Sequence, residues 1–129
     1  MLVVDDEPDS RDLVKRLLEG GGAKVSTASS AEEALILIRQ ERPAVLISDI
    51  GMPGEDGYSL MRRLRSLAEE SGGGTAAIAL TAYARAEDRA QAMRAGFQYH
   101  ISKPVEPAEL MAVVASAARE SFPRMTPRS

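Results

Sequence analysis

Five short apolar runs alternate with longer segments whose apolar residues recur every three or four positions, and this alternation constrains the fold more than any other feature of the chain. The runs cover residues 2–4, 24–28, 44–47, 76–80 and 99–102. The segments with helical spacing cover residues 13–18, 31–38, 60–67, 90–94 and 110–117, and the fourth of them has the weakest pattern. Strands that alternate with helices are joined by right-handed crossovers. The sequence therefore predicts an α/β domain of (βα)5 type, a doubly wound parallel sheet of five strands with helices on both faces.

Residues that start and stop helices support this interpretation. Ser30 and Glu33 have the spacing of a capping box, and Pro8 and Pro107 suit the first turn of a helix. Glycines follow three of the helical segments, where a helix C-terminus favours positive φ: residues 20–22, 72–74 and 96.

A chain of 129 residues is long enough to bury one hydrophobic core, and we expect a single domain over residues 1–120. Residues 121–129 contain two prolines and little periodicity, which predicts a flexible tail.

Cysteine is absent and His100 is the single histidine, so a disulfide framework, a thiolate zinc site and a cage of several histidines are excluded. Any bound metal must therefore have oxygen ligands. The formal charge of −3 provides no broad basic surface for nucleic acid or an anionic membrane. Neither a membrane-spanning run nor the pattern of a signal peptide is present. We therefore expect a cytoplasmic protein that binds neither nucleic acid nor membrane directly.

Acidic residues follow two of the predicted strands. Asp5 and Asp6 come directly after the first run, and Asp49 follows the third. If those strands are neighbours, three carboxylates converge, and their repulsion requires either raised pKa values or a cation. Mg²⁺ suits a site of two acids and a main-chain carbonyl. Taken alone, Asp5 and Asp6 could equally cap the following helix.

Two further polar residues change this balance. Thr81 follows the fourth run and Lys103 follows the fifth, so a hydroxyl and an ammonium group join the acids at the ends of the strands. Phosphoryl transfer requires a nucleophile, a metal and donors for the phosphoryl oxygens. The acids, Thr81 and Lys103 together would supply a carboxylate nucleophile, metal ligands and two such donors. The glycine-rich segment 51–57 matches neither GxGxxG nor a P-loop, so a nucleotide cradle is not expected.

Four segments together resemble the receiver domain of two-component response regulators, over the chain up to about residue 120: residues 3–8, 48–57, 79–83 and 102–104. The resemblance implies a flavodoxin-like sheet with strand order 2-1-3-4-5. It also implies that Asp49 accepts a phosphoryl group from the phosphohistidine of a histidine kinase or of a histidine phosphotransfer protein. Asp6 and Asp49 would bind Mg²⁺ directly together with the main-chain carbonyl of Gly51, and Asp5 would contribute through water.

The same resemblance implies roles for the remaining site residues. Thr81 and Lys103 would bind the phosphoryl oxygens, and the Lys103–Pro104 peptide bond would be cis. Thr81 would move inward and make room for the switch residue, which is His100 here, where many receivers carry Tyr or Phe. The alternative for His100 is an ordinary, partly buried imidazole with one hydrogen bond. The output would be a changed surface around the fourth helix, the fifth strand and the fifth helix.

Residues 81–89 and 95–105 look most like receivers at the C-terminus of hybrid sensor histidine kinases. The parent chain would then be a histidine kinase, and this domain its cytoplasmic part. The alternative is a standalone, single-domain regulator. In either case we expect a monomer or weak dimer that is not an enzyme beyond its own phosphotransfer and dephosphorylation.

Two other functions compete with this interpretation. A phosphatase similar to the haloacid dehalogenases would carry Asp-x-Asp after the first strand, where Asp5, Asp6 and Glu7 stand instead. A pseudo-receiver scaffold would have lost an acid, Thr81 or Lys103, and all are present. Arginines at 62, 63 and 65 are expected to form a solvated helix face rather than a partner surface.

Overall fold

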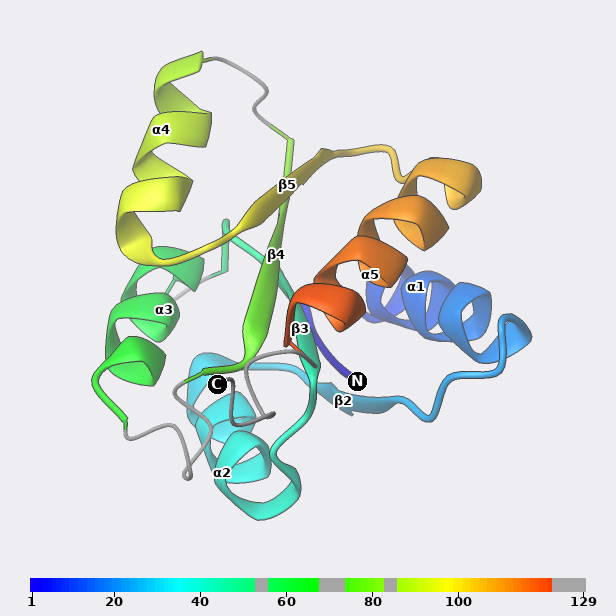
Figure 1. Ribbon diagram of the computed structural model, residues 1–129, viewed down its shortest axis with the longest axis horizontal. Helices are drawn as coiled ribbons and strands as arrows, with labels where there is room; N and C mark the ends of the chain where they lie inside the picture. The colour runs from blue at the N-terminus through cyan, green and yellow to red at the C-terminus, as the bar shows by residue number, and fades with distance from the viewer. Residues whose placement is uncertain (53–55, 68–73, 83–85, 122–129) are drawn as a thin grey trace.

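The computed structural model describes residues 1–52, 56–67, 74–82 and 86–121. Strands and helices alternate along these residues, as predicted (Figure 1). In chain order they are β1 (Leu2–Val4), α1 (Pro8–Gly20), β2 (Ser26–Ala28), α2 (Ala31–Glu41), β3 (Val45–Asp49), α3 (Gly57–Arg65), β4 (Ala76–Thr81), α4 (Ala86–Ala95), β5 (Tyr99–Ser102) and α5 (Pro107–Ser121). Among the described residues, no helix has the length and apolar character needed to cross a membrane. The predicted tail lies outside the described residues from 122 onward, and Ser121 belongs to α5.

The five strands form one parallel sheet in the order β2-β1-β3-β4-β5, which confirms the predicted topology. The order places β1 directly beside β3, with Val4 opposite Ser48. The residues that follow these two partners, Asp5 and Asp49, therefore leave the sheet at the same edge. In a parallel sheet this edge holds the carboxyl ends of all the strands.

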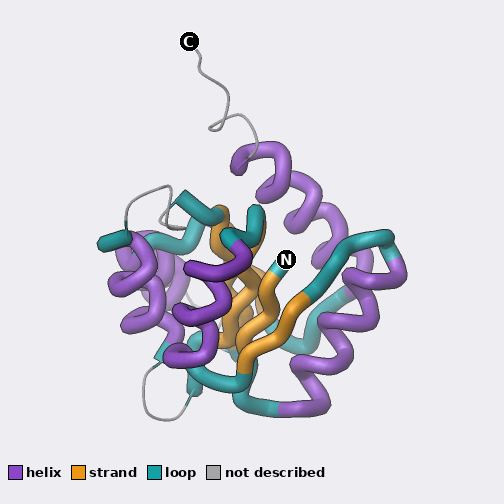
Figure 2. Tube along the Cα trace, turned by 90° about the horizontal axis from the view of Figure 1, so that it is seen from below, coloured by secondary structure: helices purple, strands orange, loops and turns teal. Residues whose placement is uncertain are grey.

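Two hydrophobic cores lie on the two faces of the sheet, because side chains alternate along each strand. Leu2 and Val4 of β1 belong to the core under α2 and α3, whereas Val3 belongs to the core under α1 and α5. Figures 1 and 2 show helices on both sides of the sheet. Every residue of β3 and β4 is buried, as expected for strands covered on both faces.

The start of α2 follows the predicted capping geometry. Ser30 is the N-cap residue, and its hydroxyl accepts a hydrogen bond from the Glu33 backbone N–H at 3.2 Å. The Glu33 carboxylate accepts from the backbone N–H of Ser29 at 2.9 Å, one residue before the cap. Pro8 and Pro107 open α1 and α5, as predicted.

The ends of the helices bear out the glycine signals only in part. Gly22 and Gly96 adopt positive φ, as predicted, and residues 72 and 73 lie outside the described residues. The end of α2, for which no glycine was predicted, is capped by Arg42 with φ of 47°. The third helix ends at Arg65, so Leu67 lies beyond it and packs against the core from outside the helix. Apolar spacing marks the residues that face a core, and Leu67 does so without being helical.

Candidate functional site

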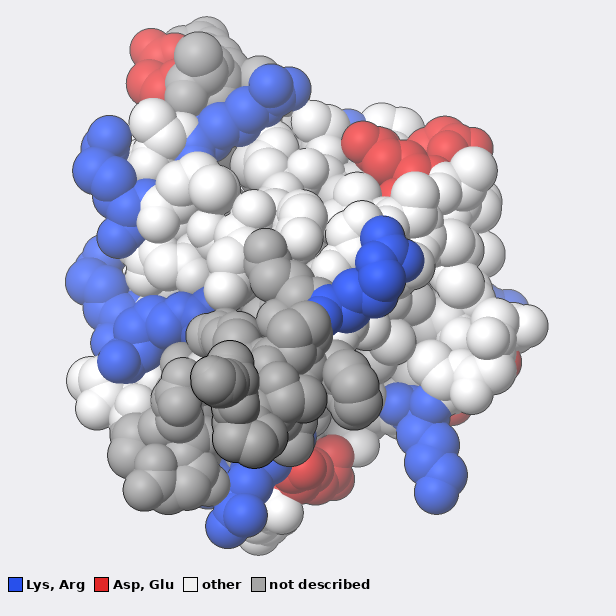
Figure 3. Space-filling model, in the orientation of Figure 1, with Lys and Arg blue, Asp and Glu red and all other residues white. Residues whose placement is uncertain are grey.

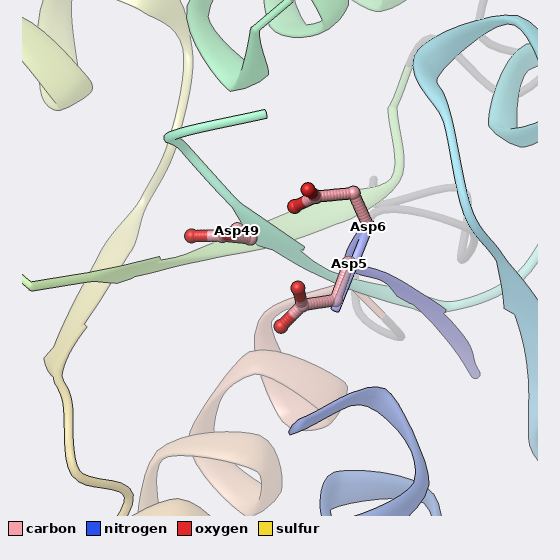
Figure 4. A group of neighbouring side chains, drawn as sticks. All are labelled: Asp5, Asp6 and Asp49. Atoms are coloured by element: carbon pink, nitrogen blue, oxygen red, sulfur yellow. The ribbon is translucent and has the colours of Figure 1, made fainter. Parts of the chain in front are cut away.

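Three carboxyl groups meet at the carboxyl ends of β1 and β3. Asp5, Asp6 and Asp49 each offer an oxygen, and these oxygens all lie within 4.8 Å of one another (Figure 4). The neighbouring position of β1 and β3 produces this cluster, because it brings residues more than forty positions apart in the sequence to the same point.

Asp5 is fully buried, whereas Asp6 is exposed. One carboxylate oxygen of Asp5, Oδ1, accepts a hydrogen bond from the backbone N–H of Glu7 at 2.9 Å. The main-chain carbonyl of Asp5 accepts from the Arg11 guanidinium at 2.9 Å. The second carboxylate oxygen, Oδ2, is buried and has no hydrogen-bond donor among the described residues. A buried carboxylate oxygen in this condition requires a cation, because desolvation of the charge is otherwise uncompensated.

Lys103 supplies the positive charge that this structure places beside the acids. Its Nζ lies 3.5 Å from Asp5 Oδ2 and 3.3 Å from Asp49 Oδ1. The lysine is placed by the β4–β5 pairing, in which its backbone N–H donates to the Thr81 carbonyl at 2.8 Å. The Lys103–Pro104 bond is cis, the isomer that the resemblance implied.

Asp49 is 7% exposed and is the last residue of β3. Burial raises the pKa of its carboxyl above the usual 3.8, and the charge of Asp5 raises it further. Lys103 and a hydrogen bond from the Gly51 backbone act against this rise in pKa. The carboxylate of Asp49 is therefore more basic than an ordinary aspartate, which favours it as a nucleophile.

A pocket of about 210 Å³ opens beside these groups. It is lined by Asp49, Ile50, Gly51, Thr81, Ala82 and Lys103. Three of the predicted phosphoryl-handling residues, Asp49, Thr81 and Lys103, therefore share one cavity. Asp5 and Asp6 lie beside it in the acidic cluster.

The donor set fits a hard divalent cation. All three side chains of the cluster offer carboxylate oxygens, the ligands that Mg²⁺ prefers, and three carboxylates outnumber the single ammonium group of Lys103 beside them. Gly51, the predicted source of a main-chain ligand, lies at the rim of the same pocket.

His100 lies close to this site without lining its pocket. Ile101 packs in the core under α1 and α5, so its neighbour His100 points to the opposite face of the sheet, half-buried. Thr81 lies on that same face, because Leu80 belongs to the core under α1 and α5. His100 pairs with Ala79, two residues before Thr81, so the two predicted switch residues are diagonal neighbours on one face.

Two residues that support the site were not singled out from the sequence. Arg11 holds the Asp5 carbonyl from the first turns of α1, a position that its spacing does not distinguish from a solvated arginine. Gly57 begins α3 against the backbone at the end of β3. A Cβ at Gly57 would lie 2.7 Å from the Asp49 carbonyl oxygen and 2.8 Å from Ile50 Cα, whereas a Cβ at Gly51 would meet nothing within 4 Å. The glycine-rich loop contained this signal, but the sequence does not show which glycine needs to be one.

A family model described as "Response regulator receiver domain" matches residues 1–115 of the chain. The chain is 51% identical over 114 residues to the 14.6 kDa protein in the sodA1 3′ region of Leptolyngbya boryana, with 88% of this chain and 86% of that protein covered. It is 40% identical over 115 residues to response regulator Rre1 of Synechocystis sp., with 88% of this chain and 49% of that protein covered. The chain thus spans about half the length of Rre1.

Solved structures show the same fold. A response regulator receiver domain protein from Methanospirillum hungatei matches with a TM-score of 0.84 and 30% identity, over 95% of each chain. The signal receiver domain of a signal transduction histidine kinase from Syntrophus aciditrophicus matches with a TM-score of 0.77 and 26% identity, over 99% of this chain and 92% of that one.

Proposed function

Because this chain belongs to the response regulator receiver domain family, we propose that it accepts a phosphoryl group on the carboxylate of Asp49. One observation carries the proposal: a buried carboxylate shares a pocket with Thr81 and Lys103 and lies beside two further acids. A nucleophile, donors for anionic oxygens and a cation site are the parts that phosphoryl transfer requires.

The donor is a phosphohistidine on a histidine kinase or a histidine phosphotransfer protein, met in the cytoplasm. An oxygen of Asp49 bonds to phosphorus as the phosphorus–nitrogen bond of the donor breaks. The bonding electrons leave with the imidazole nitrogen, which takes a proton from water. Lys103 and the Thr81 hydroxyl would bind the phosphoryl oxygens; the distance of 3.3 Å from Lys103 Nζ to Asp49 Oδ1 and the shared pocket with Thr81 support these roles.

Asp5, Asp6 and Asp49 would hold Mg²⁺ together with the main-chain carbonyl of Gly51. When bound, the ion supplies positive charge between the carboxylates and the incoming phosphoryl oxygens. Water later hydrolyses the acyl phosphate and releases inorganic phosphate, which restores Asp49. The domain therefore acts as a phosphoacceptor that serves its own phosphorylation and dephosphorylation, and not as an enzyme for an external substrate.

The signal is proposed to pass from Thr81 to His100 and to the surface of α4, β5 and α5. The placement of Thr81 and His100 on one face of the sheet supports this route.

Intact mass after incubation with Mg²⁺ and acetyl phosphate tests the proposal. The wild type and Asp56→Asn should gain one phosphoryl mass, and Asp49→Asn should gain none. Asp56 is a matched control because it caps α3, where its side chain accepts from the Ser59 backbone N–H, and asparagine also caps helices well. A gain by Asp49→Asn, or no gain by the wild type, would refute the assignment.

The parent context has two candidates. The histidine kinase receiver of Syntrophus aciditrophicus supports a hybrid kinase, the context predicted from the sequence. The 14.6 kDa relative, of which this chain covers 86%, supports the standalone regulator, and its higher identity makes that the better supported context. An immunoblot of extract from the source cells separates the two: a band near the 13.8 kDa of this chain indicates a standalone protein, and a band several times larger indicates a hybrid kinase.

A further inference from the structure

Arg65, the last residue of α3, is bound to three backbone or side-chain acceptors from other parts of the chain. Its Nε and one terminal nitrogen donate to the Gly96 carbonyl at 3.1 and 2.8 Å. Its other terminal nitrogen donates to the Thr75 carbonyl at 2.6 Å, and Gln98 Oε1 accepts a further bond at 3.1 Å. The prediction that Arg65 belongs to a solvated helix face is therefore wrong, although Arg62 and Arg63 are exposed as predicted.

These bonds join elements that are distant in the sequence. Thr75 precedes β4, Gly96 lies between α4 and β5, and Gln98 precedes β5. Gln98 also makes two hydrogen bonds to Ala77 of β4. Its side-chain oxygen accepts from the Ala77 backbone N–H at 2.7 Å, and its backbone N–H donates to the Ala77 carbonyl at 2.9 Å. The planar fork of the guanidinium carries several N–H donors that point in different directions, so it can bind three acceptors at once. The single ammonium group of a lysine could not reproduce this set of bonds.

The turn that receives Arg65 is built around its side chain. Gly96 has φ of +119°, which disfavours any other residue. A Cβ at this position would also lie 2.8 Å from Arg65 Cγ and 3.1 Å from Nε. Glycine is therefore required both by the backbone and by the close approach of the arginine.

The attachment lies at one end of α4, and the packing of α4 is concentrated at the same end. Ala92 is the fully buried side chain among those of α4 that the structure describes, and Phe97, just beyond the helix, is 1% exposed. Before Ala92, Asp88 is half-buried and Glu87, Arg89, Ala90 and Gln91 are exposed; after it, Met93 and Arg94 are exposed as well. Figure 3 shows basic side chains along the edge of the molecule where α3 and α4 lie, and the basic residues of these two helices are all arginines.

We propose that Arg65 fixes the C-terminal end of α4, so that a change at the phosphorylation site moves the helix at its N-terminal end. The chain enters that end from β4, whose last residue is Thr81. Arg65 is a positioning residue in this account and touches no reacting group. The inference about movement rests on the proposed function, whereas the anchor itself rests on the contacts of Arg65 alone.

Amide hydrogen exchange, measured with and without Mg²⁺ and beryllofluoride as a phosphoryl analogue, tests the anchor. In the metal-free wild type, residues 92–98 should exchange more slowly than residues 86–91. Arg65→Met should speed exchange in residues 92–98 by about tenfold or more, because several charge-assisted hydrogen bonds are lost. Arg62→Met is the matched control, since it removes the same charge from an exposed position of the same helix, and it should leave both segments unchanged.

The response to beryllofluoride tests the second part of the proposal, that α4 moves at its N-terminal end. In the wild type and in Arg62→Met the change should be confined to residues 86–91, and in Arg65→Met it should extend through residues 92–98. Equal exchange of residues 92–98 in Arg65→Met and the wild type would overturn the anchor. If beryllofluoride changes the exchange of both segments equally in the wild type, the proposed movement at the N-terminal end of α4 would be overturned. A wild type with no response at all, and no phosphoryl gain from acetyl phosphate, would refute the proposed function and with it the movement, while the metal-free comparison would still decide the anchor.

Two further variants keep the test decisive if Arg65→Met does not fold. Arg65→Lys retains the charge without the fork and should give an intermediate increase in exchange of residues 92–98. Gly96→Ala places a Cβ too close to the Arg65 side chain and should therefore speed exchange in the same segment. Unchanged exchange in both variants would contradict the anchor.

Discussion

Asp49 lies buried beside a second buried carboxylate, Asp5, and this placement opposes folding when no metal is bound. Burial is the larger cause of the raised pKa of Asp49, the charge of Asp5 adds to it, and Lys103 acts against it. A carboxyl with a raised folded pKa binds its proton more tightly in the folded state than in the unfolded state. Its contribution to stability is therefore lost as pH rises from the ordinary value of 3.8 through the folded value.

The first prediction concerns Asp49→Asn. The variant should unfold a few degrees above the wild type in metal-free buffer near neutral pH, since about 1 kcal/mol shifts Tm by roughly 4 °C in a domain of this size. The gain should shrink as pH falls and vanish at about pH 3, where the wild-type carboxyl is protonated in both states. Thermal unfolding followed by circular dichroism measures both values. A gain that is the same at both pH values would contradict the electrostatic cause.

Lys103 provides a second test at the scale of single residues. It neutralises Asp5 and Asp49 in the metal-free site, so Lys103→Met should lower stability by about 2 kcal/mol near neutral pH. The same variant should bind Mg²⁺ about tenfold more tightly, because a positive charge next to the acidic cluster is removed. It should nevertheless accept little phosphoryl from acetyl phosphate. Calorimetric titration with Mg²⁺ is the decisive measurement, and weaker binding than in the wild type would contradict the assigned position of Lys103.

At the scale of elements, the entry to α3 depends on one glycine. Gly57→Ala should destabilise the domain by about 2 kcal/mol, because a Cβ would collide with the backbone of Asp49 and Ile50. Gly51→Ala is the matched control from the same loop. It meets open space and should change the free energy of unfolding by less than about 1 kcal/mol. Chemical denaturation measures both, and equal costs would show that α3 does not need this close approach.

The strands and helices could be predicted because their signals are local. Continuous apolar runs located β3 and β4, and Ser30 located the start of α2. The end of α2 could not be predicted, because Arg42 adopts a left-handed conformation that residues other than glycine rarely take. Arg65 was misassigned for a related reason: its acceptors are carbonyls of turns whose positions only the folded chain determines.

At the scale of the whole molecule, the acidic cluster should couple metal binding to folding. Mg²⁺ at roughly one hundred times its Kd should stabilise the wild type by about 2.7 kcal/mol, because the unfolded chain does not hold the three carboxylates together. Asp6→Asn should lose most of this gain, and Asp56→Asn, outside the cluster, should keep it. Thermal unfolding across a Mg²⁺ titration at constant ionic strength measures the effect. Equal stabilisation of Asp6→Asn and the wild type would indicate nonspecific screening.

Much of the candidate site also followed from the sequence. The order of the strands brings Asp5, Asp6, Asp49, Thr81 and Lys103 to one edge of the sheet, and each of these residues follows or ends an apolar run. The burial of Asp5 against the exposure of Asp6 could not be predicted, since the two are adjacent and identical. The support from Arg11 and Gly57 is likewise tertiary, because it depends on how α1 and α3 leave the sheet.

Locating the acyl phosphate in the chain tests the central claim most directly. The protein is incubated with Mg²⁺ and acetyl phosphate and reduced with borohydride, which converts an aspartyl phosphate to homoserine. Peptide mass spectrometry then locates the converted residue. We predict homoserine at position 49 and unchanged aspartate at positions 5 and 6. A phosphoryl gain with aspartate intact at position 49, or homoserine at position 5 or 6, would contradict the account.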